Sequence, residues 1–240
     1  MNITDHFQKT AIINLPERKD RRTETIAECK RINCTIDNHK TAFFPAVKPA
    51  EPAGFPSIGV RGCFLSHMEV IRQAQQYQLG NILVMEDDIA FTPSANAILA
   101  EAMLELAGKE WGFLYLGHEY PVDSSRKERL LAIHEPLLLA HCYAVNSTIF
   151  QSFLAFLEQL LQRPPGHPDG GPMHYDGAIS TFRMQNPGIT TYILNPSIAY
   201  QRSSRTDLHE ISLWDRMPFL SPFIKSMRTL KNTMKRLSLQ

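Results

Sequence analysis

Three consecutive acidic residues, Glu86, Asp87 and Asp88, directly follow the apolar run at residues 82–85. Residues two apart on a strand share a face, so Glu86 and Asp88 are expected to point together into the crevice at the strand end. Two hard carboxylates in that position suit Mg²⁺ or Mn²⁺ and leave coordination positions for a diphosphate. The run therefore predicts Asp88 as the first metal ligand and Glu86 as its companion. Solvated acids or helix caps are the alternative.

The elements that would hold this acidic run alternate between apolar strands and segments of helical period. We predict strands over residues 11–15, 43–47, 81–85, 113–116, 137–145 and 190–194. We predict helices over residues 20–31, 62–76, 93–106, 147–161 and 175–183. This alternation indicates an α/β fold, with a mostly parallel sheet wrapped by helices and ligands at the carboxyl ends of the strands.

The composition excludes several classes of protein. The 240-residue chain is 43% hydrophobic and 20% charged, which is ordinary for a globular domain. A formal net charge of +1 argues against a general nucleic-acid binder. Four cysteines without a CxxC pair indicate reduced thiols. The N-terminus does not resemble a signal peptide and no apolar stretch approaches the roughly 18 residues of a membrane span, so we expect a cytoplasmic protein.

Three motifs occur in order along the chain: INLPERKDRR at residues 13–22, GCFLSH at residues 62–67 and LVMEDDI at residues 83–89. Weaker matches follow at residues 114–117, 174–176 and 196–204. Together, over about residues 11–207, they resemble glycosyltransferase family 25, a group of lipopolysaccharide-modifying and collagen-modifying sugar transferases. The resemblance implies a GT-A type fold, an inverting mechanism and, often, UDP-galactose as the donor.

In such a fold Asn14, Arg18 and Arg21 lie just past the first strand, where a nucleotide base or ribose would rest. Arginine offers a planar fork for phosphate or uracil oxygens. The alternative for these residues is a solvated helix start. Glu86 would support either the ribose or the metal.

Ser66 and His67 fall near the first turn of the predicted helix 62–76, where free backbone N–H groups favour anions. His67 could face a phosphate or the acceptor, and a structural role among apolar neighbours is the alternative. Cys63 is most simply a small buried residue.

Transfer with inversion needs a base that deprotonates the attacking hydroxyl. Asp176 follows a proline- and glycine-rich loop and precedes a predicted short helix, so it is our candidate, with a capping role as the alternative. Gln201, Arg202 and Arg205 follow the last predicted strand. Their polar and cationic side chains could neutralise the diphosphate, and an exposed loop is the alternative.

The C-terminal segment carries apolar residues at helical spacing over residues 220–237, and no acid follows Asp215. We therefore predict a GT-A like domain over residues 1–215 and a basic amphipathic helix over residues 216–240. Such a helix suits the inner face of an anionic membrane, where a lipid-linked acceptor would lie. The alternative is a helix packed on the domain or on a second subunit.

The expected reaction moves a hexose, galactose by family resemblance, from a UDP-sugar to a hydroxyl of a glycan such as lipopolysaccharide. The expected partners are the nucleotide-sugar donor, Mn²⁺ or Mg²⁺, and the glycan acceptor. Two alternatives stay open. One is a non-catalytic relative that binds a glycan or a protein partner, and the other is a nucleotide-diphosphate-sugar hydrolase, which would release free sugar without an acceptor.

Overall fold

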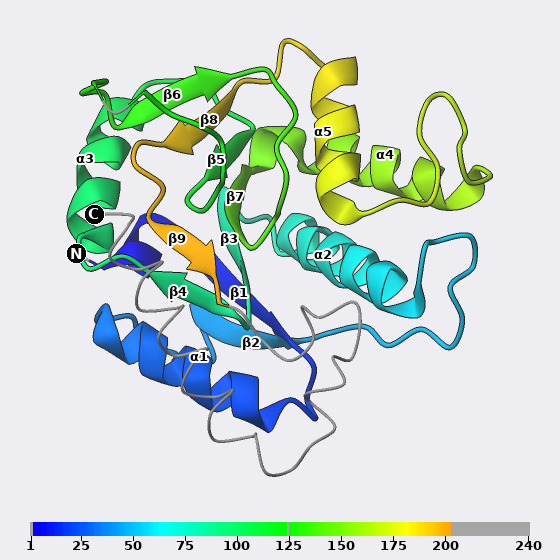
Figure 1. Ribbon diagram of the computed structural model, residues 1–240, viewed down its shortest axis with the longest axis horizontal. Coiled ribbons are helices and arrows are strands. Elements are labelled where there is room, and N and C mark those ends of the chain that lie inside the picture. Colours follow the sequence, from blue (N-terminus) through cyan, green and yellow to red (C-terminus); the bar gives the residue numbers. More distant parts are fainter. Residues whose placement is uncertain (1, 124, 203–240) are drawn as a thin grey trace.

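A seven-stranded mixed sheet forms the centre of the computed structural model, which describes residues 2–123 and 125–202 (Figure 1). Its strands are β1 (Lys9–Asn14), β2 (Thr41–Pro45), β3 (Asn81–Glu86), β5 (Phe113–Tyr115), β6 (Leu130–Ile133), β7 (Cys142–Asn146) and β8 (Thr191–Leu194). They lie in the order β2-β1-β3-β7-β5-β8-β6. Five run in one direction, while β6 and β7 run opposite to their neighbours. The predicted α/β class with a mostly parallel central sheet is confirmed.

Helices cover both faces of this sheet. They are α1 (Lys19–Arg31), α2 (Ile58–Gln76), α3 (Ala95–Leu106), α4 (Phe150–Gln162) and α5 (Tyr175–Gln185), with short 3₁₀ turns at Ile3–His6 and Ser147–Ile149. Figure 1 shows α2, α4 and α5 gathered on one side and α1 and α3 on the other. One apolar cluster accordingly joins the sheet to α2, α4 and α5, and a second joins it to α1 and α3.

The inner strands are apolar because both of their faces are covered. Ile12 of β1 and Leu83 and Val84 of β3 have no exposed surface. Near-continuous apolar runs are typical of parallel strands with helices on both sides. This explains why β1 and β3 stand out in the sequence. Because the two strands are parallel neighbours, their carboxyl ends lie side by side.

Helix α2 begins four residues earlier than the sequence predicts. Ser57 is its N-cap, and the Ser57 hydroxyl accepts a hydrogen bond from the Val60 N–H at 3.1 Å. Ser66 and His67 consequently lie in the third turn of the helix, where backbone N–H groups are already bonded within the helix. The expectation that these two residues meet an anion at a helix start is therefore wrong.

Strand β3 ends at Glu86, and residues 87 and 88 form a turn into β4 (Ile89–Phe91), which pairs with β9 (Ala199–Gln201). Strand alternation stops at Glu86, so the prediction that Glu86 and Asp88 point together from one face is wrong. Glu86 instead bonds to side chains of α2 and β9, whereas Asp88 pairs with a side chain of α1.

The predicted strand over residues 137–145 is shorter in the structure, where β7 begins at Cys142. Residues 137–139 run along α5 instead: the Leu137 N–H donates to the Ser180 hydroxyl at 3.2 Å, and the Leu139 N–H donates to Asp176 Oδ2 at 3.0 Å. Strand β6 and the β4–β9 pair, which the sequence analysis does not predict, complete the sheets.

The predicted helix over residues 216–240, its membrane segment 220–237 and Arg205 lie outside the described residues. The domain boundary at residue 215 therefore stays a prediction. Among residues 2–123 and 125–202, no helix is long and apolar enough to cross a bilayer.

Candidate functional site

A pocket of about 330 Å³ opens where β1 and β3 end. Its walls come from the end of β1, the start of α1, the segment after β2, the first half of α2 and the turn after β3. The polar side chains in its lining are Arg21, Lys48, Cys63, Ser66, His67, Glu86 and Asp87. The carboxyl ends of parallel strands are the usual ligand position in an α/β sheet, and this pocket lies in that position.

Asp87 and Asp88, which we call the acid turn, are almost fully buried, with 6% and 4% of their surfaces exposed. Arg21 of α1 pairs with both carboxylates: its Nη1 lies 2.7 Å from Asp87 Oδ1 and 3.3 Å from Asp88 Oδ2. The Asn14 amide donates to Asp87 Oδ2 at 2.7 Å, because the parallel register sets Ile13 beside Glu86 and so brings Asn14 level with Asp87. The acid turn is thus held against β1 and α1.

Glu86 faces the other side of the pocket. Its Oε1 lies 3.3 Å from His67 Nε2, and its Oε2 accepts a hydrogen bond from the Gln201 amide at 3.0 Å. Desolvation opposes ionisation of Glu86, but the hydrogen bond and charge of His67, with smaller contributions from His141 and Arg21, outweigh it. The net effect holds the pKa of Glu86 below its usual range.

His67 has no exposed surface, and its ring is fixed by two tyrosines. The ring stacks on Tyr175 with centroids 4.3 Å apart, and Nδ1 lies 2.9 Å from the Tyr143 hydroxyl. The Tyr143 hydroxyl also donates to the Tyr175 hydroxyl at 2.9 Å. Burial raises the pKa of both phenols, so they stay protonated around neutral pH. His67 is therefore a rigid core residue whose Nε2 is directed at Glu86.

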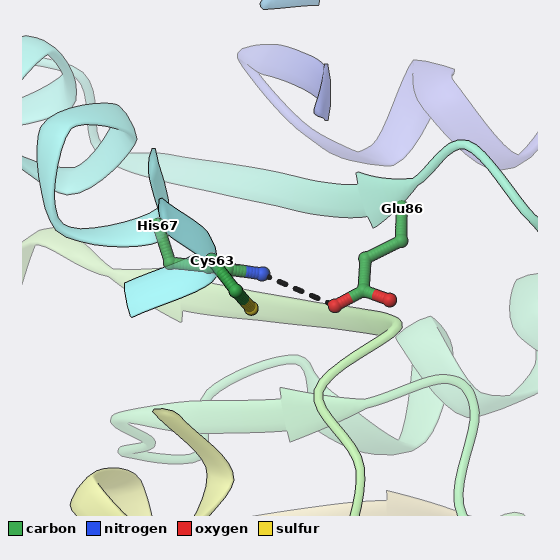
Figure 2. Close-up of side chains that lie close together, drawn as sticks. All are labelled: Cys63, His67 and Glu86. Carbon is green, nitrogen blue, oxygen red and sulfur yellow. Dashed lines mark hydrogen bonds and ion pairs between the residues drawn. The ribbon is translucent and has the colours of Figure 1, made fainter. Parts of the chain in front are cut away.

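Cys63 lies one helical turn before His67 on α2, and it is exposed rather than buried as the sequence suggests. Its exposed surface belongs to the pocket wall. Desolvation raises the pKa of its thiol well above the usual range, and the charges of Glu86, Asp176 and Asp88 add to this. The sulfur, a His67 ring nitrogen and a Glu86 carboxylate oxygen all lie within 4.8 Å of one another (Figure 2). We call these three residues the mixed cluster.

Ser66 is buried, and its hydroxyl is used within the fold. It donates to the Gly62 carbonyl at 2.6 Å and accepts the Val47 N–H at 2.8 Å, which ties the segment after β2 to α2. Gly62 makes this possible, since a Cβ there would lie 2.9 Å from the Val47 carbonyl. Ser66 therefore shapes the pocket wall.

Two of the predicted cationic groups bind protein oxygens. Arg202 donates through Nη2 to the Asp87 carbonyl at 2.9 Å and through Nε to the Asp88 carbonyl at 3.3 Å, so it supports the backbone of the acid turn. Arg18 donates to Asp20 at 2.9 and 3.0 Å at the start of α1. Arg202 thus belongs to the site, while Arg18 lies at its rim.

Asp176 sits in the first turn of α5, where its carboxylate accepts the Leu139 and Gly177 N–H groups at 3.0 and 2.8 Å. It therefore fastens residues 137–139 to α5. The charge of Asp176 acts on one pocket residue, since it contributes to the raised pKa of the Cys63 thiol. Asp176 lies on α5 and is not among the residues that line the 330 Å³ pocket.

Two polar side chains of the pocket, Cys63 and Lys48, are not predicted as site residues from the sequence. The signal for Cys63 was present, because residues four apart on a helix share a face and Cys63 precedes His67 by four. Lys48 lies in a proline-rich loop without periodic pattern, so no local signal marked it.

A family model described as "Glycosyltransferase family 25 (LPS biosynthesis protein)" matches residues 56–204, more than half of the chain. The matched region contains α2, the acid turn, the mixed cluster and β9. No match was found among curated proteins.

Solved structures align over most of the chain at low similarity. A glycosyltransferase involved in glycosylation of the major capsid of PBCV-1 shares 11% identity at a TM-score of 0.40, covering 83% of this chain and 96% of that one. The inositol-1-phosphate CTP transferase of T. maritima shares 10% identity at a TM-score of 0.43, covering 85% and 93%. A mutant of Drosophila β-1,4-galactosyltransferase 7 in complex with manganese, UDP-Gal and xylobiose shares 10% at 0.40, covering 85% and 74%. Likeness at this level assigns no substrate to this chain.

Proposed function

The chain belongs to glycosyltransferase family 25 and is a glycosyltransferase, and we propose that it transfers galactose from UDP-galactose, with inversion, to a hydroxyl of a glycan such as lipopolysaccharide. The observation that carries the proposal is the acid turn beside a 330 Å³ pocket at the carboxyl ends of β1 and β3. Acidic and basic side chains meet there in the place where an α/β sheet binds nucleotides.

The charges around the acid turn favour a divalent cation. Glu86, Asp87 and Asp88 supply three carboxylates, and the guanidinium of Arg21 pairs with the last two. Carboxylate oxygens are hard ligands that fit Mn²⁺ or Mg²⁺, so Asp88 would hold the ion, whereas its predicted companion Glu86 turns to His67 and Gln201. When bound, the cation offsets charge that develops on the departing diphosphate.

The donor would lie along the β1–α1 side of the pocket. Asn14 and Arg21 already meet the acid turn, and Arg18 stands at the rim, where a planar guanidinium can reach a base or phosphate oxygen. Lys48, in the segment after β2, adds a cation beside Glu17, with which it pairs. These groups would orient the nucleotide, with Gln201 holding Glu86 in place.

The leaving diphosphate would be met by cations near the end of β9. Arg202 is bound to the carbonyls of the acid turn, so its charge is fixed close to the carboxylates. Arg205, outside the described residues, follows three positions later in the chain. We assign both to stabilising the leaving group.

Asp176 would act as the base. As the acceptor oxygen attacks the anomeric carbon, its proton passes to the Asp176 carboxylate, while the bond between the sugar and the diphosphate breaks and the nucleotide keeps the electron pair. The Leu139 and Gly177 N–H groups fix the carboxylate for this role.

An acceptor carried by a lipid would be reached at a membrane surface. The basic residues and helical apolar spacing of residues 220–237 support a peripheral contact there. Cytoplasmic localisation on the inner face of the membrane is part of the same proposal.

Calorimetry with UDP, GDP, CMP and ADP, with and without Mn²⁺, tests the donor site. We expect Mn²⁺-dependent binding of UDP alone, lost in Asp88→Ala and kept in Asp123→Ala, a matched aspartate change on an exposed loop. Failure of every nucleotide to bind a folded protein would refute the donor assignment. Release of free galactose at a rate that no acceptor raises would indicate a hydrolase instead.

A further inference from the structure

The mixed cluster brings three different ligand types to one point. Cys63 and His67 lie on the same face of α2, and Glu86 reaches them from the end of β3. Their sulfur, nitrogen and oxygen atoms lie within 4.8 Å of one another. In residues 2–123 and 125–202, no other group of three or more cysteine, histidine, aspartate or glutamate side chains converges in this way. The three acids at the end of β3 therefore do not form such a group among themselves.

The spacing of the nitrogen and oxygen atoms in the cluster matches that of two ligands around one ion, with the Cys63 sulfur within 4.8 Å of both. Two ligands on a tetrahedral zinc ion, with bonds of about 2.0–2.1 Å, lie roughly 3.3–3.4 Å apart. His67 Nε2 and Glu86 Oε1 are 3.3 Å apart. This distance is long for a charge-assisted N–H···O hydrogen bond, which is usually about 2.7–2.9 Å.

Neighbouring groups hold the ligands in the orientation that a metal site requires. The Tyr143 hydroxyl lies 2.9 Å from His67 Nδ1, so Nε2 is directed at Glu86 (Figure 2). The Gln201 amide binds Glu86 Oε2 and leaves Oε1 turned toward the cluster. Metal-binding histidines and carboxylates are commonly oriented by a second hydrogen bond of this kind.

We propose that Cys63, His67 and Glu86 bind a zinc-class cation, at a site separate from the oxygen-only Mn²⁺ or Mg²⁺ site of Asp88. Thiolate and imidazole ligands select zinc over magnesium or manganese, and the Cys63 thiol would lose its proton to solvent as the ion binds. Three protein ligands leave the fourth position of a tetrahedral ion open, as in catalytic zinc sites. All three residues line the pocket, so that position would take a water molecule.

The site contributes a cation to the α2 wall of the pocket without using Asp88. Its existence does not depend on the proposed sugar transfer, because it rests on the cluster geometry alone. Glu86 links the two sites: Oε1 faces the mixed cluster, while the next residues form the acid turn.

Cobalt is the probe for this site, because a Co²⁺–thiolate bond gives a charge-transfer absorption in the near ultraviolet. We expect metal-free protein to bind one equivalent of Co²⁺ with that absorption, and Zn²⁺ to abolish it. Cys63→Ser should remove the band and weaken Zn²⁺ binding about tenfold or more, since a hydroxyl replaces the soft ligand. Cys142→Ala, which changes a buried cysteine outside the cluster, should keep both.

Controls separate this site from the donor site. Asp88→Ala should keep the cobalt band while losing Mn²⁺-dependent UDP binding, and Cys63→Ser, at an exposed position, should fold and still bind UDP with Mn²⁺. A wild-type protein without the band, or a band unchanged in Cys63→Ser, would overturn the proposal and leave His67 and Glu86 as an ion pair. Loss of UDP binding with the band retained would overturn only the donor assignment.

Discussion

The two sides of the pocket meet at the end of β3 but differ in chemistry. On the α1 side, Asp87 and Asp88 offer oxygen only, are 4–6% exposed and pair with Arg21. On the α2 side, the mixed cluster offers sulfur, nitrogen and oxygen, and Glu86 bonds to His67 and Gln201. One side therefore suits a hard divalent cation and the other a softer one.

This difference follows from where β3 stops. Glu86 is the last strand residue and points toward α2, whereas the two residues after it turn toward α1. Three adjacent acids are thus divided between two environments by one change in backbone direction. Substitutions that act on one side only can test whether the division is functional.

The largest expected effect comes from Asp88→Asn, which keeps the shape of the acid turn and removes one hard ligand. Because the cation offsets charge on the leaving diphosphate, we expect kcat/KM for galactose transfer to fall about 10³-fold. Cys63→Ser should change Mn²⁺-dependent UDP binding by less than about threefold. Initial rates with UDP-galactose and calorimetry provide the two measurements. An equal loss of Mn²⁺-dependent UDP binding in both variants would mean that the pocket holds a single metal site.

A smaller loss is expected from a substitution on α5. Asp176→Asn cannot accept the acceptor's proton, so we expect kcat to fall about 10²-fold while UDP binding with Mn²⁺ is unchanged. Ser180→Ala is the control, because it removes the other α5 side chain that fastens residues 137–139 and should leave kcat within about threefold. If both variants lost the same activity, Asp176 would act only by holding that loop.

The positions of the acid turn and of the main strands could be predicted because the information is local. The apolar run of β3 and the acids after it are adjacent in sequence, and burial on both faces makes such runs conspicuous. The start of α2 was predicted four residues too late, because Ser57 follows a proline-rich segment and is not recognisable as an N-cap from the sequence. Three-residue strands such as β4 and β9 lack a detectable period.

The partners of each site residue could not be predicted, because they depend on packing between distant elements. Asn14 reaches Asp87 only through the parallel register of β1 and β3, and Arg21 reaches it only because α1 packs beside that turn. Cys63 joins Glu86 only once α2 lies against β3. Side-chain chemistry was visible in the sequence, whereas its division between two sides of a pocket was not.

Arg21→Gln tests the α1 side through stability. Removing the guanidinium leaves two buried carboxylates without their cation, which costs about 3 kcal/mol of unfolding free energy. Mn²⁺ should restore part of this loss, because a metal ion can replace the missing charge. Urea unfolding with and without Mn²⁺ measures both effects. An equal loss in Arg18→Gln, whose partner Asp20 has a 62% exposed side chain, would show that burial is not the cause.

The smallest effect is expected at the exposed start of the same helix, α1. The hydrogen bond from Arg18, with smaller help from backbone N–H groups and the arginine's charge, lowers the pKa of Asp20 to about 2 despite some desolvation. A lowered folded-state pKa means that the pair stabilises the fold above the usual value of about 3.9 and loses this contribution as pH falls toward 2. Because the pair is exposed, Asp20→Asn should cost less than about 0.5 kcal/mol at neutral pH. Unfolding free energies from about pH 5 to about pH 2 should therefore converge for wild type and variant at the acid end, whereas a difference that grows on acidification would contradict the assigned ion pair.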